Sequence, residues 1–284
     1  MKGKMRRFMM VLAAVVFVGS SAMVGYQHYQ YHLGEQAYTQ AEELAGIPDF
    51  TVLVQEPVES VQIPEPVVPT AQEPEVLPAA PETEPEQQEE PVWVDPYADA
   101  LAAMDFSALR EVNGEVLGWI LIPDTPVSYP LMLGEDNQKY LNTTWRGSRS
   151  SVGSIFLECQ NSGDLSDFNT IVYGHRTANR SMFGSLKDYA RQEYWQAHPY
   201  IYITDDGGCK TYAVFAAYEV GVKELTYRIG FDGEEDRTQF LDFCTAQSVI
   251  DTGVTPSADS RVLTLSTCTG TGHETRWVVQ AVLV

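Results

Sequence analysis

Lysine and arginine are missing from a long stretch of this 284-residue chain. Neither occurs between Arg7 and Arg110, an interval that holds 17 aspartate and glutamate residues. The remainder, from Arg110 on, is acidic too, and the whole chain has a formal net charge of −21. Nucleic-acid binding requires a basic face that neutralises phosphates. The charge distribution therefore excludes nucleic acid as a partner.

Cysteine is scarce as well. The four cysteines are Cys159, Cys209, Cys244 and Cys268, and their spacing matches no metal-ligand pattern. If one of them is kept free for chemistry, an odd number remains, which argues against a full disulfide framework. We expect Cys244 in the core and the Cys159 and Cys209 side chains in loops or at strand ends.

The first 26 residues combine a basic cluster with an uncharged apolar run. Lys2, Lys4, Arg6 and Arg7 precede a stretch over 8–26 without charged residues. Its length suits a membrane-spanning helix, and the basic cluster predicts a cytoplasmic N-terminus with the rest of the chain outside the cell. The alternative is a cleaved signal peptide ending near Ala22. The apolar run continues past that site, which favours an uncleaved, single-pass anchor.

Residues 27–96 read as an extracellular stalk. The interval 47–96 holds 11 of the 16 prolines, interleaved with glutamate, valine and glutamine. Such a composition buries too little apolar surface to fold and favours extended, disordered chain. The part before it, 27–45, could continue the helix out of the membrane. Since 1–96 contain no recognisable site, we expect them to be dispensable for chemistry in solution.

Residues 97–284 have the texture of one folded domain that is mainly β. Eight alternating or apolar runs separated by turn residues predict strands, and eight strands suggest a closed barrel. The runs are 117–122, 127–133, 153–158, 169–175, 200–205, 210–220, 261–268 and 275–284. Peripheral helices are predicted over 181–195 and 233–248, and a short one opens at Asp95-Pro96.

One cysteine and one arginine lie where two predicted strands meet. Cys268 ends the run "RVLTLSTC", and Arg276 begins the next, so a hairpin would make them near neighbours across the two strands. A cysteine nucleophile also needs an imidazole and a donor for an oxyanion. His175, after a glycine at the end of "NTIVYGH", is the candidate imidazole. His273 competes for that role from the hairpin loop, whereas His198 is predicted to be structural.

These motifs resemble the sortases, the cell-surface transpeptidases of Gram-positive bacteria. "TLSTC" with Arg276 and "NTIVYGH" carry the likeness, while "LGWILIPDTPVSYPLML", "DNQKYL", "GSIFLE", "MFGSLKDY" and "HPYIYI" resemble class B members. The resemblance implies an eight-stranded barrel in which Cys268, His175 and Arg276 meet in a groove. Matching motif positions imply that Asn137, Leu141 and Ser266 line it.

The resemblance also implies a reaction. Cys268 would attack the threonine carbonyl of a cell-wall sorting signal of the LPXTG or NPXTN kind and form a thioester. His175 would move the protons and Arg276 would hold the oxyanion. An amine of a peptidoglycan precursor or cross-bridge would then receive the surface protein, without a metal or organic cofactor. Thr269 departs from the acidic residue often found after the nucleophile.

Three alternatives remain open at this stage. Asp95-Pro96-Tyr97 is similar to the lid tripeptide of pilin-polymerising class C sortases, although Asp95 and Pro96 also suit a helix start. Another cysteine enzyme, an L,D-transpeptidase or an endopeptidase, is a second alternative. The L,D-transpeptidases usually have His and Cys close together in a Ser-His-Gly-Cys type run, which is absent here. A stalked adhesin would suit the anchor and stalk, yet it has no need of residues 175, 268 and 276.

Overall fold

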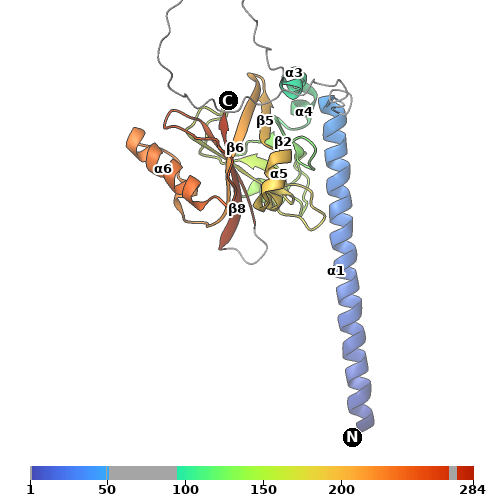
Figure 1. The fold of residues 1–284 in the computed structure, drawn as a ribbon. Coiled ribbons are helices and arrows are strands. Elements are labelled where there is room, and N and C mark those ends of the chain that lie inside the picture. Colours follow the sequence, from blue (N-terminus) through green and yellow to red (C-terminus); the bar gives the residue numbers. More distant parts are fainter. Residues whose placement is uncertain (1, 49, 51–94, 269–273) are drawn as a thin grey trace, which may run out of the picture. The chain divides into compact units, whose positions relative to one another are not determined.

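Eight strands close into one barrel in the computed structural model, which describes residues 2–48, 50, 95–268 and 274–284 (Figure 1). The chain divides into two units, Met1–Pro48 with Ala98–Val284, and Asp49–Tyr97. The strands are β1 Val116–Leu121, β2 Ser128–Met132, β3 Ile155–Leu157, β4 Asn169–Tyr173, β5 Tyr200–Asp205, β6 Gly208–Gly221, β7 Val262–Cys268 and β8 Thr275–Leu283. The prediction of eight strands and a closed barrel is confirmed.

The order of strands around the barrel is β1-β2-β3-β4-β7-β8-β6-β5, and β5 pairs with β1 to close it. Two neighbouring pairs, β2 with β3 and β4 with β7, are parallel, and the others are antiparallel. The parallel β4–β7 pair joins segments about ninety residues apart in sequence. This crossover brings the ends of "NTIVY" and "TLSTC" to the same edge of the barrel.

Helix α6, Glu234–Gln247, covers one side of the barrel (Figure 1). Three of its residues, Phe240, Leu241 and Cys244, are buried in a cluster that also contains Tyr218 of β6 and Val278 of β8. The helix begins with three acidic residues, which favourably face the positive end of its dipole. The predicted helix over 233–248 and the core position of Cys244 are confirmed.

The helix predicted over 181–195 is wrong as a single element. The chain instead forms a short 3-10 helix, η2 Leu186–Ala190, and then α5 Gln192–Ala197. Arg191 between them is extended, with φ −111° and ψ 129°. Tyr189 is buried, and its hydroxyl donates to the His198 carbonyl at 2.7 Å, which ties the end of η2 inward. Side-chain burial therefore overrides the local preference for a continuous helix.

The N-terminal segment of the domain is also interrupted. It forms α3 Pro96–Ala102 and α4 Ser107–Val112, because the Asp105 carboxylate accepts both the N–H and the hydroxyl of Ser107 and starts a new helix there. Two further 3-10 turns, η1 Lys139–Leu141 and η3 Leu225–Tyr227, lie in loops beside the barrel.

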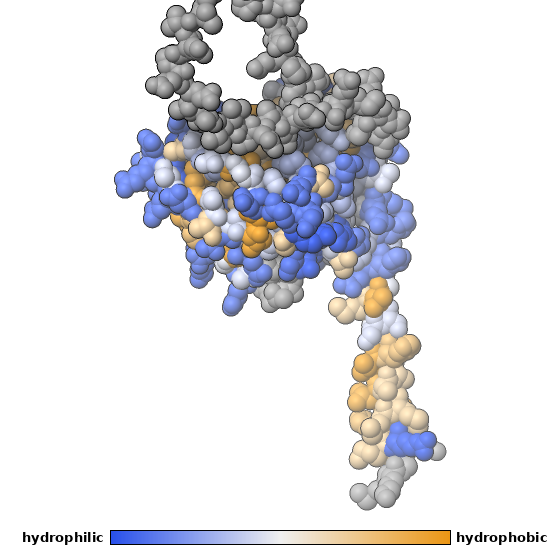
Figure 2. Space-filling view, viewed as in Figure 1, coloured by the Kyte–Doolittle hydropathy of each residue, from blue (hydrophilic) through white to orange (hydrophobic). Residues whose placement is uncertain are grey.

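Helix α1 spans Lys2–Ala45 without a break. Its N-terminal half is long and apolar enough to cross a membrane, and Figure 2 shows this half as a continuous apolar surface with a polar tip. Its last turns bury Tyr38, Ala41 and Ala45. Residues 27–45 continue this helix, as the sequence allows, and they lie within the same unit as the barrel instead of in a separate stalk. Most of the predicted stalk, 51–94, lies outside the described residues.

Asn169, the first residue of β4, anchors that strand through a buried polar network. Its amide nitrogen donates to the carbonyls of Thr226 and Arg228 at 3.1 and 3.0 Å, and its oxygen accepts from Thr264 at 2.7 Å. The side chain is buried, so water cannot replace these bonds. The network ties β4 to β7 and to the connection that leads from β6 to α6.

We predict that Asn169→Ala lowers the free energy of unfolding by about 2–4 kcal/mol, because it leaves buried carbonyl and hydroxyl groups unsatisfied. Urea unfolding of the purified full chain, followed by tryptophan fluorescence, measures the change. The matched control is Asn142→Ala, at an exposed position, which should stay within about 0.5 kcal/mol of the parent chain. Equal stability of the two variants would contradict the anchoring role of Asn169.

Candidate active site

The register of three neighbouring strands places the predicted residues at one edge of the barrel. Along β4 and β7 each partner is 93 residues further on, from Asn169 with Val262 to Tyr173 with Ser266. The same offset, continued two residues past Tyr173, would bring His175 level with Cys268. Cys268 in turn pairs with Arg276 across β7 and β8. The three positions therefore lie on adjacent segments of one rim.

His175 fits its place because two glycines stand around it. A Cβ on Gly174 would lie 2.4 Å from Ile155 Cδ1 and 2.7 Å from Phe183 Cδ2, so no larger residue fits there. Gly153 has a φ of +66°, and a Cβ on it would approach Tyr140 O and His175 Cδ2 to within 2.7 and 2.8 Å. Gly174 thus permits Ile155 and Phe183 to approach the backbone beside His175, and Gly153 leaves room for the imidazole itself.

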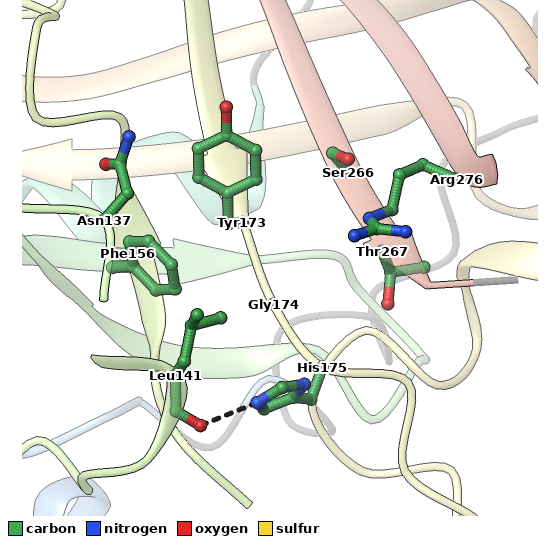
Figure 3. Close-up of a pocket in the computed structure, with 9 residues that line it drawn as sticks. All are labelled: Asn137, Leu141, Phe156, Tyr173, Gly174, His175, Ser266, Thr267 and Arg276. Atoms are coloured by element: carbon green, nitrogen blue, oxygen red, sulfur yellow. Dashed lines mark hydrogen bonds between the residues drawn. The ribbon is translucent and has the colours of Figure 1, made fainter. Parts of the chain in front are cut away.

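The imidazole of His175 is oriented by a backbone carbonyl. Nε2 lies 2.7 Å from the Leu141 carbonyl oxygen (Figure 3). A carbonyl can only accept, so Nε2 carries the proton of this bond. The second ring nitrogen points away from Leu141, toward the side of the groove where Thr267 and Arg276 lie. Proton exchange with a group in the groove would therefore use Nδ1.

A groove of about 600 Å³ contains the site (Figure 3). Its lining consists of Asn137, Leu141, Phe156, Tyr173, Gly174, His175, Ser266, Thr267 and Arg276. Five of the six residues that the sequence singled out are among them: Asn137, Leu141, His175, Ser266 and Arg276. The structure describes the sixth, Cys268, through its backbone at the end of β7. Its strand partner Arg276 and its neighbour Thr267 both line this groove.

Four lining residues were not predicted, namely Phe156, Tyr173, Gly174 and Thr267. All four lie inside motifs that carried the family resemblance, so the signal was present in the sequence. Phe156 and Tyr173 form an aromatic pair with ring centroids 5.4 Å apart and give one wall an apolar surface. The Thr267 hydroxyl is buried and has no partner among the described residues, which leaves it available to a group bound in the groove.

A buried carboxylate holds two groove residues in place. Glu158 is 4% exposed, and its oxygens accept from the Asn137 amide at 2.7 Å and from the Tyr173 hydroxyl at 2.9 Å. The Asn137 oxygen accepts from the Cys159 N–H at 2.9 Å, which fixes which way the amide faces. Burial and the adjacent Glu158 charge raise the pKa of Tyr173 far above its usual value, so the phenol stays a donor. Sequence reasoning missed Glu158.

Ser266 and Arg276 contribute differently to the groove, one to its shape and the other to its charge. Ser266 is buried, and its hydroxyl lies 2.9 Å from the Tyr227 hydroxyl, so its contribution is to the shape of the wall. Arg276 is half-buried at the start of β8, where its guanidinium donates to the Thr275 carbonyl at 2.9 Å. Figure 3 shows this guanidinium beside Thr267. It supplies a permanent positive charge to the groove.

Two of the other cysteines, Cys159 and Cys244, have environments that disfavour the thiolate. Among the described residues Cys159, Cys209 and Cys244 form no disulfide. Burial raises the pKa of Cys244 to about 11. Burial and the hydrogen bond and charge of Glu158 also raise the pKa of Cys159. At neutral pH both remain protonated, and the thiolate is the nucleophilic form.

The other two histidines of the domain, His198 and His273, differ from His175 in what the structure shows of them. His198 Nδ1 lies 3.0 Å from the Pro123 carbonyl oxygen, and its ring contacts the Tyr194 ring in a tilted arrangement with centroids 4.4 Å apart, consistent with the structural role predicted for it. His273 lies outside the described residues. Within the described part of the barrel edge, His175 is the imidazole that lines the groove.

Comparison with known proteins identifies relatives of the whole barrel. The family model described as Sortase domain matches residues 120–284. Sortase B of Staphylococcus aureus (strain NCTC 8325 / PS 47) is 34% identical over 181 residues, which cover 63% of this chain and 74% of that protein. A solved Staphylococcus aureus sortase B-substrate complex aligns with a TM-score of 0.60 and 33% identity, over 63% of this chain and 84% of that one. A structure of sortase B complexed with Gly3 aligns equally well, with 33% identity over 63% and 85%.

We predict that iodoacetamide at pH 7 modifies Cys268 before Cys159 and Cys244. With a pKa of about 11, roughly one Cys244 thiol in ten thousand is ionised at pH 7, and this fraction rises as the pH approaches 11. A neighbouring arginine favours the thiolate of Cys268. Peptide mass spectrometry after short labelling of the folded chain measures the order, and Cys268→Ala should remove the fast phase. Faster labelling of Cys159 or Cys244 would contradict the assignment.

Proposed function

The chain belongs to the sortase family, and from this premise we propose that it cleaves a C-terminal sorting signal of the LPXTG or NPXTN kind after threonine and transfers the protein to a peptidoglycan amine. That it is a sortase-type cysteine transpeptidase follows from the family. The substrate, the intermediate and the residue roles are the proposal. The observation that supports it is the strand register, which pairs Cys268 with Arg276 and whose offset along β4 and β7, continued past Tyr173, would bring His175 level with Cys268; His175 and Arg276 both line the groove.

In the first half-reaction, the Cys268 thiolate attacks the threonine carbonyl carbon of the bound signal. The carbonyl oxygen becomes an oxyanion, and the Arg276 guanidinium offers it charge-assisted hydrogen bonds. The protonated His175 donates from Nδ1 to the leaving nitrogen as the C–N bond breaks. The products are a thioester on Cys268 and a free amine on the departing peptide.

In the second half-reaction, an acceptor amine attacks the thioester carbonyl. The now neutral His175 accepts the proton of that amine at Nδ1, the C–S bond breaks and the Cys268 thiolate leaves. A new amide bond joins the surface protein to the acceptor. The bond from Nε2 to Leu141 O keeps the ring in one orientation through both steps, which supports a single imidazole acting first as acid and then as base.

The groove supports an extended peptide as the substrate. Leu141, Phe156 and Tyr173 provide an apolar surface, while Asn137 is held at a fixed angle by Glu158 and the Cys159 N–H. Polar groups with fixed orientation beside apolar walls are typical of specific ligand sites. Solved sortase B structures include a substrate complex and a complex with Gly3, which supports peptide signals and peptide amines as the two substrates here.

We further propose that α1 anchors the enzyme with its N-terminus in the cytoplasm and the barrel outside the cell. The support is a helix long and apolar enough to span a membrane, whose first turns hold a basic cluster that favours the cytoplasmic side. The surface proteins that carry the signal and the cell-wall amines are both found on that outer side.

A pilin amine is the second candidate acceptor, because Asp95-Pro96-Tyr97 is similar to a class C lid. In the structure the Asp95 carboxylate accepts the Tyr97 N–H at 3.0 Å, and Pro96 is the first residue of α3. This is the geometry of a helix start. It supports the role of helix cap for these residues and the cell wall as the acceptor.

We predict that the chain converts a sorting-signal peptide to a hydroxamate when hydroxylamine is present, because hydroxylamine resolves a thioester. Cys268→Ala should abolish the product, while Cys209→Ala should keep it. Mass spectrometry of the enzyme without acceptor should find the acyl group on Cys268. An acyl group on Cys159, Cys209 or Cys244 would contradict the proposal.

Arg276→Lys should lose most of the activity although the charge is kept. A compact ammonium cannot reproduce the paired hydrogen bonds of the planar guanidinium, and loss of one oxyanion donor costs on the order of 10²-fold in kcat. Steady-state peptide cleavage measures the effect. The matched control is Arg261→Lys, at an exposed position before β7, which should behave like the parent chain. Near-normal turnover of Arg276→Lys would limit Arg276 to a general electrostatic role.

A further inference from the structure

The last turns of α1 make specific polar contacts with one loop of the barrel domain. The Tyr38 hydroxyl donates to the Gly153 carbonyl at 2.5 Å and lies 3.3 Å from Ser154 Oγ. The Trp145 indole donates to the Ala37 carbonyl at 2.7 Å, and Arg146 hydrogen-bonds Gln40. Tyr38 and Trp145 are buried, so these bonds are shielded from water. The helix is therefore held on the loop by bonds as well as by packing.

The loop that α1 holds is the one that orients His175. It begins at η1 with Leu141, whose carbonyl accepts from His175 Nε2. Ser154 N–H donates to the Tyr140 carbonyl at 2.9 Å, which closes the loop beside Leu141. Gly153 lies between these contacts, where a Cβ on it would reach His175 Cδ2 at 2.8 Å. The Tyr38 hydroxyl thus holds the carbonyl of the glycine whose missing side chain leaves room for the imidazole.

A second route from Tyr38 reaches the other side of His175. The rings of Tyr38 and Tyr129 meet edge to face with centroids 5.1 Å apart. The Tyr129 hydroxyl accepts the Met182 N–H at 3.0 Å. The next residue, Phe183, donates its N–H to the His175 carbonyl at 3.0 Å. Tyr38 is therefore linked both to the loop that contacts the His175 ring and to the segment of Phe183, which bonds the His175 backbone.

We propose that Tyr38 is a positioning residue for His175, so that the helix with the candidate membrane span also sets the orientation of the imidazole. The inference rests on the proposed function, in which His175 moves the protons. It reverses the expectation that residues 1–96 are dispensable for chemistry. Without the Tyr38 hydroxyl, Gly153 O loses its buried donor and the Leu141 loop gains freedom. A small displacement of a proton-transfer group lowers kcat steeply.

The test compares Tyr38→Phe with Tyr29→Phe in the full chain in detergent micelles. The two changes remove the same atom from the same helix, but Tyr29 is 57% exposed. For Tyr38→Phe we expect kcat to fall by about tenfold, with KM within about twofold, because the groove walls that contact the peptide stay in place. Tyr29→Phe should match the parent chain in both constants.

Nitrogen-15 NMR of labelled histidine gives a readout that does not depend on activity. The parent chain and Tyr29→Phe should show His175 with its proton on Nε2, and Tyr38→Phe should show a mixture with the Nδ1–H form. Wild-type kcat and tautomer in Tyr38→Phe, whether or not the melting temperature falls, would overturn the proposal. Equal loss of kcat in both variants would also overturn it. A parent chain that forms no hydroxamate would instead count against the proposed function, and the NMR comparison would still test whether Tyr38 positions the ring.

Discussion

The hydrogen-bond ladder between β4, β7 and β8 is the constraint on which the site depends. A shift of one residue in the parallel β4–β7 pair would move His175 away from the level of Cys268, and a slip of β8 would move Arg276 away from both. The register is held by buried apolar residues along all three strands and by Asn169 and Thr264 at the start of the parallel pair. The reactive edge of the barrel is thus specified by contacts at its opposite end.

The site also depends on residues that hold the His175 imidazole in one position. Gly153 leaves the space that His175 needs, Gly174 lets Ile155 and Phe183 pack against the backbone before it, and the Leu141 carbonyl sets its tautomer. The carboxylate of Glu158 does the same for Asn137 on the other wall. These groups touch no reacting atom in the proposed mechanism, yet each removes a freedom that a reacting side chain would otherwise have. The contact of α1 with the Gly153 loop extends this set of supports to the N-terminal helix.

The strands and the site motifs could be predicted because alternation, turn residues and strand ends are local properties of the sequence. The barrel could be predicted from their number. Four features could not be predicted. The break at Arg191 depends on burial of Tyr189. The His175 bond uses a backbone carbonyl, a group that every residue has and that no sequence motif marks. The buried Glu158 gains its role from residues 21 positions before it and 15 after it. The docking of 27–45 on the barrel domain was hidden because these residues read equally well as a helix in solvent.

The most direct measurement is a crystal structure of the chain with a sorting-signal peptide whose threonine carbonyl is replaced by a group that bonds covalently to cysteine. The account predicts electron density joined to Cys268 Sγ, with the oxygen that replaces the carbonyl within hydrogen-bond distance of the Arg276 guanidinium. It also predicts His175 Nδ1 facing the peptide and Nε2 still on the Leu141 carbonyl. An adduct whose oxygen points away from Arg276, or an imidazole turned so that Nε2 faces the peptide, would contradict it.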